Sequence, residues 1–284
     1  MERSKRVMWL VLLLIFVLIA GGCGTSSAEK DAKGTITIGL NNWPENIAVS
    51  NMWKILLEEK GYKVELSAME KSPVWAGIAK GDLDIAPEVW LPQTDEPLYN
   101  EYKDQLELHE AWYEGTALGL VVPAYMDINS IEDLDKLGIN TIVGIDPGAS
   151  MMKLTKKLIK EYGLNYELIE SSEPAMMSEL TKAYKEKKPV VVTLWSPHWA
   201  FSEFDLKYLK DPKKIFGDQE NIYFMTRKEF GKDYPEVLKW MNKWHMDDQS
   251  LGQLMATINK TNSPEEGAKQ WIKENRNLTN QWFE

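Results

Sequence analysis

The sequence predicts an α/β protein with two lobes and a ligand cleft between them. Three observations support this fold class. Short apolar runs of strand length alternate with stretches of helix length, which is typical of βαβ units with mainly parallel sheets. This alternation occurs once before residue 123 and again from residue 141. The chain has 284 residues, of which 44% are hydrophobic, and this is enough for two cores of ordinary size.

The expected elements follow this pattern in two parts. The first part has strands at Thr35–Leu40, Lys63–Leu66, Leu83–Val89 and Leu118–Val122, with helices near Ile47–Lys60 and Val74–Lys80. The second part has strands at Thr141–Ile145, Glu167–Ile169 and Val190–Leu194, with helices at Ala149–Tyr162 and Pro174–Lys187.

The end of the chain, residues 228–284, is expected to be mostly helical. Ser263 followed by Pro264 and Glu266 marks a helix start, because Ser is a good cap and Pro fits the first helical position. The candidate crossing points between the lobes are Pro123 and Ile222–Thr226. We therefore expect one lobe of residues 35–122 with 223–284, and a second lobe of residues 123–222.

The first residues have the pattern of a secretory signal peptide. Basic side chains at Arg3, Lys5 and Arg6 precede an apolar run over residues 7–20 and then Gly21-Gly22-Cys23. The run is too short to span a bilayer comfortably at about 1.5 Å per residue, although an uncleaved membrane anchor is the alternative. The segment resembles a bacterial lipobox, which implies a signal peptide at 1–22, a lipid on Cys23 and a lipid-anchored linker at 23–34.

The charge and the cysteine count exclude several classes of function. The chain carries 33 Lys+Arg against 43 Asp+Glu, a net charge of −10, and so lacks the cationic character that a nucleic-acid partner requires. One Cys allows neither a disulfide framework nor a thiolate zinc site within the chain. The Gly-rich motifs of nucleotide sites are also missing from the sequence. We therefore expect no metal and no cofactor.

Tryptophan is unusually frequent, with twelve Trp against seven Phe. Trp43, Trp90 and Trp195 each follow or end an expected strand, and ligands of open α/β sheets bind beyond the carboxyl ends of the strands. A single Trp in such a place is usually a core residue, but three in matching places predict a shared cleft. Six further Trp residues are expected to pack in the core, namely Trp75, Trp199, Trp240, Trp244, Trp271 and Trp282. For Trp75 and Trp199 the alternative is the outer wall of the cleft.

Three indole faces suit a quaternary ammonium group, which binds π faces and donates no hydrogen bond. Each desolvated contact contributes roughly 2 kcal/mol, whereas micromolar affinity needs about 8 kcal/mol, so a further contact is required. The turn Asp146-Pro147-Gly148 precedes an expected helix, and backbone amides there can bind an anion. The candidate amides are those of Gly148, Ala149, Ser150 and Met151. The alternative is an ordinary helix cap made by Ser150 or Asp146.

Several segments together resemble the glycine betaine (OpuAC-type) substrate-binding proteins of osmoprotectant ABC transporters. They are Gly144–Met152, Trp195–Ser202, Lys207–Pro212 and Val89–Pro92, and the resemblance extends from Thr35 to Trp282. It implies a type II periplasmic-binding-protein fold, an ammonium cage of Trp43, Trp90 and Trp195, and carboxylate-binding amides at Ser150 and Met151. It also implies a monomer outside the cytoplasm, anchored to the membrane, whose partners are a betaine-type ligand and the permease and ATPase subunits of the transporter.

One departure from the family concerns the ligand carboxylate. Family members commonly have a His four or five residues after the Trp that matches Trp90, and this chain has Thr94 and Asp95 there. An Asp facing a carboxylate would repel it, so either Asp95 turns away or the ligand is a cation such as choline. Thr94 could donate a hydroxyl hydrogen bond, and His198 could substitute as the donor unless it is a structural residue.

An enzyme is the alternative of a different class. Asp82, Asp84 and Glu88 form an acidic group, and glycosidases use paired carboxyl groups. However, Asp84 and Glu88 flank the apolar residues of one strand, and the sequence suggests no nucleophile with an adjacent base. A carbohydrate-binding module would use Trp platforms too, but such modules are usually all-β. We therefore expect a binding protein and not an exported glycosidase.

Overall fold

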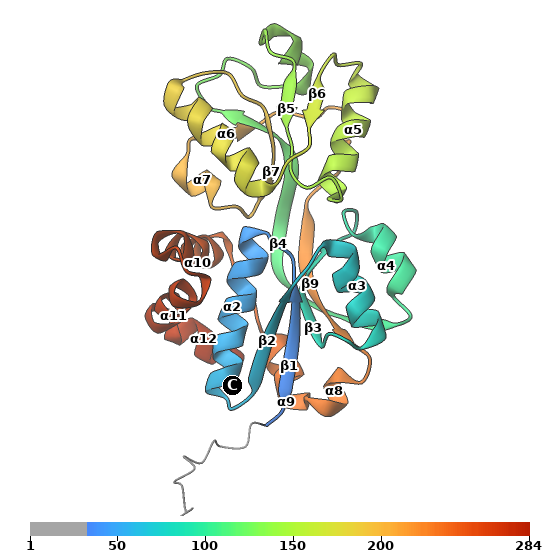
Figure 1. Ribbon diagram of the computed structural model, residues 1–284, viewed down its shortest axis with the longest axis vertical. Helices are drawn as coiled ribbons and strands as arrows, with labels where there is room; N and C mark the ends of the chain where they lie inside the picture. Colours follow the sequence, from blue (N-terminus) through green and yellow to red (C-terminus); the bar gives the residue numbers. More distant parts are fainter. Residues whose placement is uncertain (1–32) are drawn as a thin grey trace, which may run out of the picture.

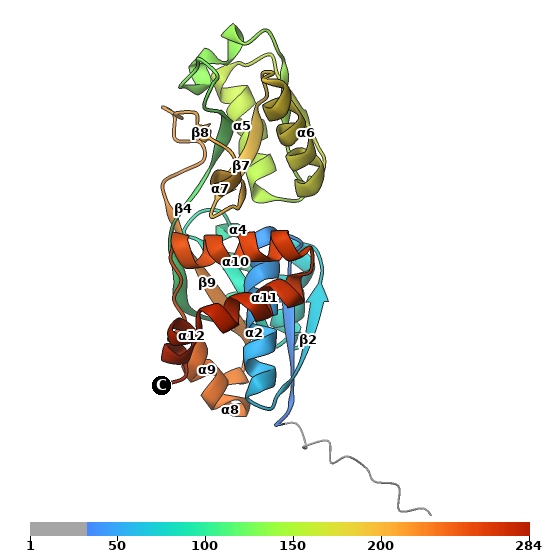
Figure 2. The ribbon, with the colours of Figure 1, turned by 90° about the vertical axis from the view of Figure 1, so that its left-hand side faces the viewer.

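The computed structural model describes residues 33–284. The predicted signal peptide, Cys23 and the linker up to residue 32 lie outside the described residues. The described chain forms two α/β lobes stacked along its longest axis, with a narrow waist between them (Figures 1 and 2). The predicted fold class is therefore confirmed.

The first lobe is built on a parallel sheet in the order β2-β1-β3. Its strands and crossover helices are β1 (Thr35–Leu40), α2 (Pro44–Glu59), β2 (Lys63–Ala68), α3 (Lys71–Lys80) and β3 (Ile85–Leu91). Strand β3 is buried along nearly its whole length, as expected for a parallel strand covered on both faces. Helix α2 lies with the C-terminal helices on one side of the sheet, and α3 lies with α4 (Glu96–Tyr102) on the other (Figure 1).

The C-terminal segment returns to the first lobe and is mostly helical, as predicted. Its helices are α8 (Phe230–Asp233), α9 (Pro235–Met241), α10 (Asp248–Thr261), α11 (Pro264–Glu274) and α12 (Arg276–Trp282). The predicted cap of α11 is confirmed, because the Ser263 side chain accepts a hydrogen bond from the Glu266 amide at 3.4 Å. Of the Trp residues assigned to the core, all are buried except Trp199, which is half-buried.

The second lobe has the parallel strand order β7-β5-β6. Its strands are β5 (Thr141–Val143), β6 (Glu167–Ile169) and β7 (Val192–Ser196), with the antiparallel β8 (Leu206–Tyr208) at one edge of β4. Its helices are η1 (Ile131–Lys136), α5 (Ser150–Tyr162), α6 (Glu173–Glu186) and α7 (Ala200–Glu203).

The expectation of mainly parallel sheets is wrong near the waist, where two strands pair antiparallel with their neighbours. Strand β4 (Leu106–Pro123) is much longer than predicted, and β9 (Glu220–Arg227) was not predicted as a strand. Strand β4 pairs with β9 up to Thr116 and with β7 from Ala117, so one continuous strand passes from the first lobe to the second. The lobe limits at 122/123 and 222/223 stay a prediction, and the strand pairing favours moving the first limit into β4.

Candidate functional site

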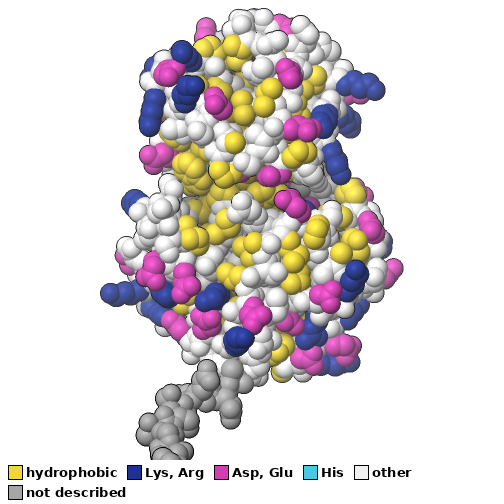
Figure 3. Space-filling model, in the orientation of Figure 1, with side chains coloured by type: hydrophobic (Ala, Val, Ile, Leu, Met, Phe, Trp, Pro, Cys, Tyr) yellow, Lys and Arg dark blue, Asp and Glu magenta, His cyan; other side chains and the backbone are white. Residues whose placement is uncertain are grey.

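A cavity lies where the two lobes meet. The molecule is hollowed at this waist, and hydrophobic side chains gather on both sides of it (Figure 3). The cavity is lined by Trp43, Glu45, Lys71, Glu88, Trp90, Thr94, Leu118, Ile145, Ala149, Ser150, Met151 and Trp195. The structure thus brings together residues of both lobes that lie as far as 152 positions apart in the chain, namely Trp43 and Trp195.

The three predicted Trp residues all line this cavity. Trp43 directly precedes α2, Trp90 lies in β3 and Trp195 lies in β7, each at or just beyond the carboxyl end of a parallel strand. The ring centroids of Trp43 and Trp195 are 6.4 Å apart with an interplanar angle of 60°, although the two residues belong to different lobes. This edge contact joins two indoles of the predicted cage across the boundary between the lobes.

Two buried glutamates hold the indoles of this cavity. The Trp195 Nε1–H donates to Glu45 Oε1 at 3.0 Å, and the Trp90 Nε1–H donates to Glu88 Oε1 at 2.8 Å. Burial raises the pKa of both carboxyl groups, and the charge of Glu88 raises the pKa of Glu45 further. The sequence analysis missed Glu45, whose only signal was its place in the first helical turn after Trp43, and considered Glu88 only for the glycosidase alternative.

Asp95 is turned away from the inner cavity. Its Oδ2 accepts hydrogen bonds from the Trp90 amide at 2.8 Å and pairs with Lys71 Nζ at 2.7 Å. Lys71 lines the cavity and places its Nζ 5.0 Å from the centre of the Trp43 ring. Burial raises the pKa of Asp95, while the charge of Lys71 acts in the opposite direction. Asp95 therefore positions a lysine at the site, a cation that the sequence analysis did not consider.

Thr94 also lines the cavity, but its polar groups are occupied. Its backbone N–H donates to Glu220 Oε1 at 2.8 Å, and its hydroxyl donates to Glu220 Oε2. The Gln93 amide donates to the same carboxylate at 2.5 Å. Glu220 lies in β9, so these bonds fix the loop between β3 and α4 against the strand next to it. The predicted role of Thr94 as a free hydroxyl donor is not favoured by this arrangement.

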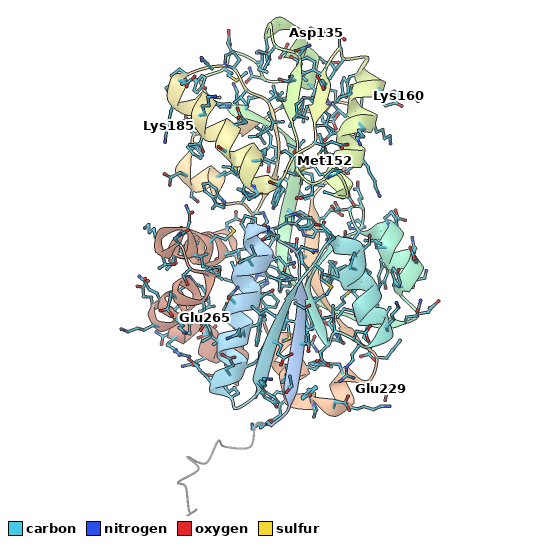
Figure 4. The ribbon with its side chains drawn as sticks, in the orientation of Figure 1. Asp135, Met152, Lys160, Lys185, Glu229 and Glu265 are labelled. Carbon is cyan, nitrogen blue, oxygen red and sulfur yellow. The ribbon has the colours of Figure 1, made fainter. Side chains whose placement is uncertain are left out.

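The turn after β5 places the N-terminus of α5 at the cavity. Ala149 is the N-cap residue, and neither Ser150 nor Asp146 makes a side-chain cap, so the helix-cap alternative does not describe this turn. The amides in the first turn of a helix have no acceptor within it and carry the positive end of the helix dipole. Ala149, Ser150 and Met151 line the cavity, while Gly148 lines the groove outside it. Met152, at the end of α5 that faces the first lobe, anchors this turn in the core (Figure 4).

His198 is a structural residue behind Trp195 and does not line the cavity. Its ring packs edge-on against Trp195 with centroids 4.7 Å apart. Its Nδ1 accepts a hydrogen bond from the Ala200 amide at 3.1 Å, and its Nε2 lies 3.2 Å from Glu173 Oε1. Burial lowers the pKa of His198, against the opposing effect of Glu173. The alternative of a structural His is therefore the one that the contacts support.

A wider groove continues outward from the cavity. The residues shared by the cavity and the groove are Trp43, Lys71, Thr94, Ala149 and Ser150, so they form the mouth of the cavity. The residues that line the cavity alone form its inner end, and they are Glu45, Glu88, Trp90, Leu118, Ile145, Met151 and Trp195. The inner end is thus aromatic with two carboxyl groups, and the mouth carries an ammonium group and the positive end of a helix.

The described part of the chain offers no other chemistry of this kind. No group of three or more His, Cys, Asp or Glu side chains within residues 33–284 could hold a metal ion. In the same range, none of the helices combines the length and the apolar character needed to cross a membrane.

Comparisons with known proteins point to one family. The family model described as the substrate binding domain of the ABC-type glycine betaine transport system matches residues 34–274. Lactococcal OpuAC in its closed conformation with glycine betaine has a TM-score of 0.84 and 35% identity, covering 88% of this chain and 100% of that one. The glycine betaine, L-proline binding protein ProX from Borrelia burgdorferi has a TM-score of 0.82 and 32% identity, covering 87% of this chain and 96% of that one.

A relative known by sequence is similar over a shorter range. The glycine betaine/carnitine transport binding protein GbuC of Listeria monocytogenes is 43% identical over 145 residues, which cover 50% of this chain and 48% of that protein. The match therefore spans about half the length of this relative.

Proposed function

Because the chain belongs to the OpuAC family of substrate-binding domains of ABC-type glycine betaine transport systems, we propose that it captures glycine betaine or a closely related betaine. Membership of this family makes it a solute-binding protein and not an enzyme, so the glycosidase alternative is dropped. The observation that carries the proposal is the convergence of three indoles and one helix N-terminus, from two lobes, on a single cavity.

In the proposed complex the ligand lies along the cavity with its trimethylammonium group at the inner end. The faces of Trp90 and Trp195 at the inner end, together with that of Trp43 on the side toward the mouth, surround that group. Each contact contributes roughly 2 kcal/mol once water is excluded. The carboxylate points to the mouth, where the amides of Ala149 and Ser150 and the ammonium group of Lys71 lie, with the amide of Met151 next to them inside the cavity. Gly148 stands next to these amides in the outer groove.

Choline is the second candidate ligand. The two carboxyl groups at the inner end favour any methylated cation, whether or not it carries a carboxylate. However, Asp95, which lines the outer groove beside the mouth, is paired with Lys71 at 2.7 Å. The ammonium group of Lys71 offsets the charge of Asp95 there, and this favours a zwitterion over choline.

The proposal includes the partners of the protein and its place in the cell. As a family member it works outside the cytoplasm and delivers its ligand to an ABC transporter. We further propose that the closed, ligand-bound monomer docks on the permease, that the ATPase supplies the energy, and that a lipid on Cys23 anchors the chain to the membrane. The resemblance of residues 1–23 to a signal peptide with a lipobox supports the anchor.

Titration of the purified protein tests the ligand class and one cage residue together. We expect glycine betaine and proline betaine to change the tryptophan fluorescence, with sugars inert. Trp195→Ala should weaken glycine betaine binding by about 2 kcal/mol or more, roughly 30-fold, because one indole face is lost. Calorimetric titration measures this loss, and circular dichroism reports whether the variant is folded.

Trp199→Ala is the matched control, because Trp199 follows shortly after Trp195 but does not line the cavity. It should bind glycine betaine as the unmodified protein does. An unchanged affinity in Trp195→Ala would remove Trp195 from the site, and a response to sugars alone would contradict the proposed function.

A further inference from the structure

Glu45 and Glu88 occupy the inner end of the cavity, and neither has a role in the proposed contacts with the ligand. Their exposed fractions are 0% and 3%, and they come from different elements, α2 and β3. A carboxyl group is costly to bury, and two adjacent ones are more so, because like charges at short range repel. Packing alone would be served better by apolar side chains, so the pair requires a functional explanation.

Each carboxyl group is coupled to one indole of the proposed cage. Glu45 accepts from the Trp195 Nε1–H, and Glu88 accepts from the Trp90 Nε1–H. A hydrogen bond in the ring plane fixes the direction of the ring and leaves both faces free for other contacts. Glu45 belongs to the first lobe and Trp195 to the second. The hydrogen bond between them therefore also joins the two lobes.

The second oxygen of each carboxyl group is buried and unsatisfied. Within residues 33–284, Glu45 Oε2 and Glu88 Oε2 have no hydrogen-bond partner. Both residues line the cavity, and an unpaired buried carboxylate oxygen costs free energy until a positive charge or a donor reaches it. Lys71 at the mouth acts on Glu88 from a distance, and the two oxygens without partners leave the inner end able to take a further positive charge.

The surrounding groups indicate which carboxyl group is ionised. Burial and the neighbouring Glu88 both raise the pKa of Glu45, whereas a backbone hydrogen bond and the hydrogen bond from Trp195 lower it. The pKa of Glu88 is raised by burial and by Asp95, but Lys71 and the hydrogen bond from Trp90 lower it. From the second lobe, Trp195 brings no charge, and His198 behind it is paired with Glu173. Glu45 therefore holds a proton more firmly than Glu88 does.

We propose that Glu88 is the counter-charge of the ligand's ammonium group, with protonated Glu45 as its neighbour, and that this charge makes the cavity select cations over neutral groups of the same shape. The inference rests on the proposed function and adds a specificity-determining residue to it. The indole faces recognise the methyl groups and the positive charge, while the ionised carboxylate behind them adds an attraction that depends on charge alone.

The test replaces each glutamate by its neutral isostere. In Glu88→Gln and Glu45→Gln the amide oxygen still accepts the indole hydrogen bond, so the ring orientation is kept while the charge is removed. We expect Glu88→Gln to raise the dissociation constant for glycine betaine about tenfold or more, and Glu45→Gln to raise it by a smaller factor, because only Glu88 is proposed to carry the charge. Calorimetric titration near pH 7 gives both values, and near-ultraviolet circular dichroism checks the tryptophan environment.

A second ligand separates charge from shape. The probe is 3,3-dimethylbutanoate, in which carbon replaces the quaternary nitrogen of glycine betaine. The unmodified protein should bind it far more weakly than glycine betaine, and Glu88→Gln should reduce this discrimination about tenfold. If the probe binds too weakly for titration, the inference is tested by the dissociation constants of glycine betaine for Glu88→Gln and Glu45→Gln.

Each outcome bears on the inference in a defined way. Equal weakening of both ligands in Glu88→Gln would overturn it, because loss of structure alone acts on both, and so would an unchanged affinity for glycine betaine. Equal losses in Glu88→Gln and Glu45→Gln would overturn the assignment of the proton to Glu45. Failure of the unmodified protein to bind any betaine would instead contradict the proposed function, so the two failures are distinguishable.

Discussion

Lys71 brings a positive charge to the mouth of the cavity, where a ligand carboxylate is proposed to lie. Its Nζ is held 2.7 Å from Asp95 Oδ2 and does not extend into solvent. Lys71→Met keeps much of the apolar stem and removes the charge. We expect glycine betaine to bind about tenfold more weakly or worse, with choline much less affected, because choline has no carboxylate. The ratio of the two dissociation constants, measured by calorimetric titration, is the readout.

Removal of Lys71 also leaves Asp95 buried without its cation, which lowers stability whatever the ligand does. Lys71→Met combined with Asp95→Asn is the control for this effect. If the single and double variants lose affinity for choline and glycine betaine equally, Lys71 acts on the fold of the site and not on the ligand carboxylate.

At the level of single residues, the sequence was informative about part of the site. Trp43, Trp90 and Trp195 could be assigned because strand ends meet at one edge of a sheet, which is a rule about topology. Glu45 and Lys71 could not be assigned, since their roles depend on partners elsewhere in the chain, Trp195 and Asp95. The same holds for Asp95, which in the sequence stands where the family commonly has a His. Its partner, Lys71, lies in α3, and the sequence does not show this pairing.

At the level of elements, α5 allows the proposed backbone contact to be tested directly. Ser150 is the first residue of this helix, and Ala149 before it has an extended backbone. Proline is tolerated at the first helical position and after an extended residue, so Ser150→Pro should fold while it removes one amide N–H from the cavity. We expect weaker glycine betaine binding by about 1 to 3 kcal/mol, with choline affected less, as measured by calorimetric titration.

Ser150→Ala is the matched control, because it removes the hydroxyl and keeps the N–H. It should bind glycine betaine almost as tightly as the unmodified protein. Equal affinities in Ser150→Pro and Ser150→Ala would exclude the Ser150 amide from carboxylate binding. The unfolding temperature of both variants shows whether α5 is intact.

The parallel βα units could be predicted because their strands are short, apolar and followed by clear helices. Strand β4 escaped prediction over its first half, where Glu107, His109, Glu110 and Glu114 interrupt the apolar pattern. Its residues there are only partly covered, and their strand conformation depends on pairing with β9, more than 90 residues later in the chain. Local sequence carries little information about such a pairing, and this is why the route between the lobes was not predicted.

At the scale of the whole molecule, β4 and β9 connect two lobes that otherwise have separate sheets. The ligand is proposed to contact both lobes, so it stabilises the arrangement in which they face each other closely. The same arrangement is supported without ligand by the Glu45–Trp195 hydrogen bond and by the contact between Trp43 and Trp195. A bound cation therefore adds to interactions that already favour closure.

We expect glycine betaine to make the protein more compact in solution, since only the closed arrangement lets indoles of both lobes touch the ammonium group. Small-angle X-ray scattering should show a smaller radius of gyration at saturating glycine betaine, with sucrose at the same concentration as the control for viscosity and contrast. Trp195→Ala should show less compaction even at saturation, because its second lobe has lost its main contact with the ligand. Identical scattering with and without glycine betaine, at a concentration where calorimetry shows full binding, would mean that the lobes are already closed in the free protein. In that case the Glu45–Trp195 bond and the packing of the two indoles are sufficient to hold the waist, and the ligand must enter through local opening of its mouth.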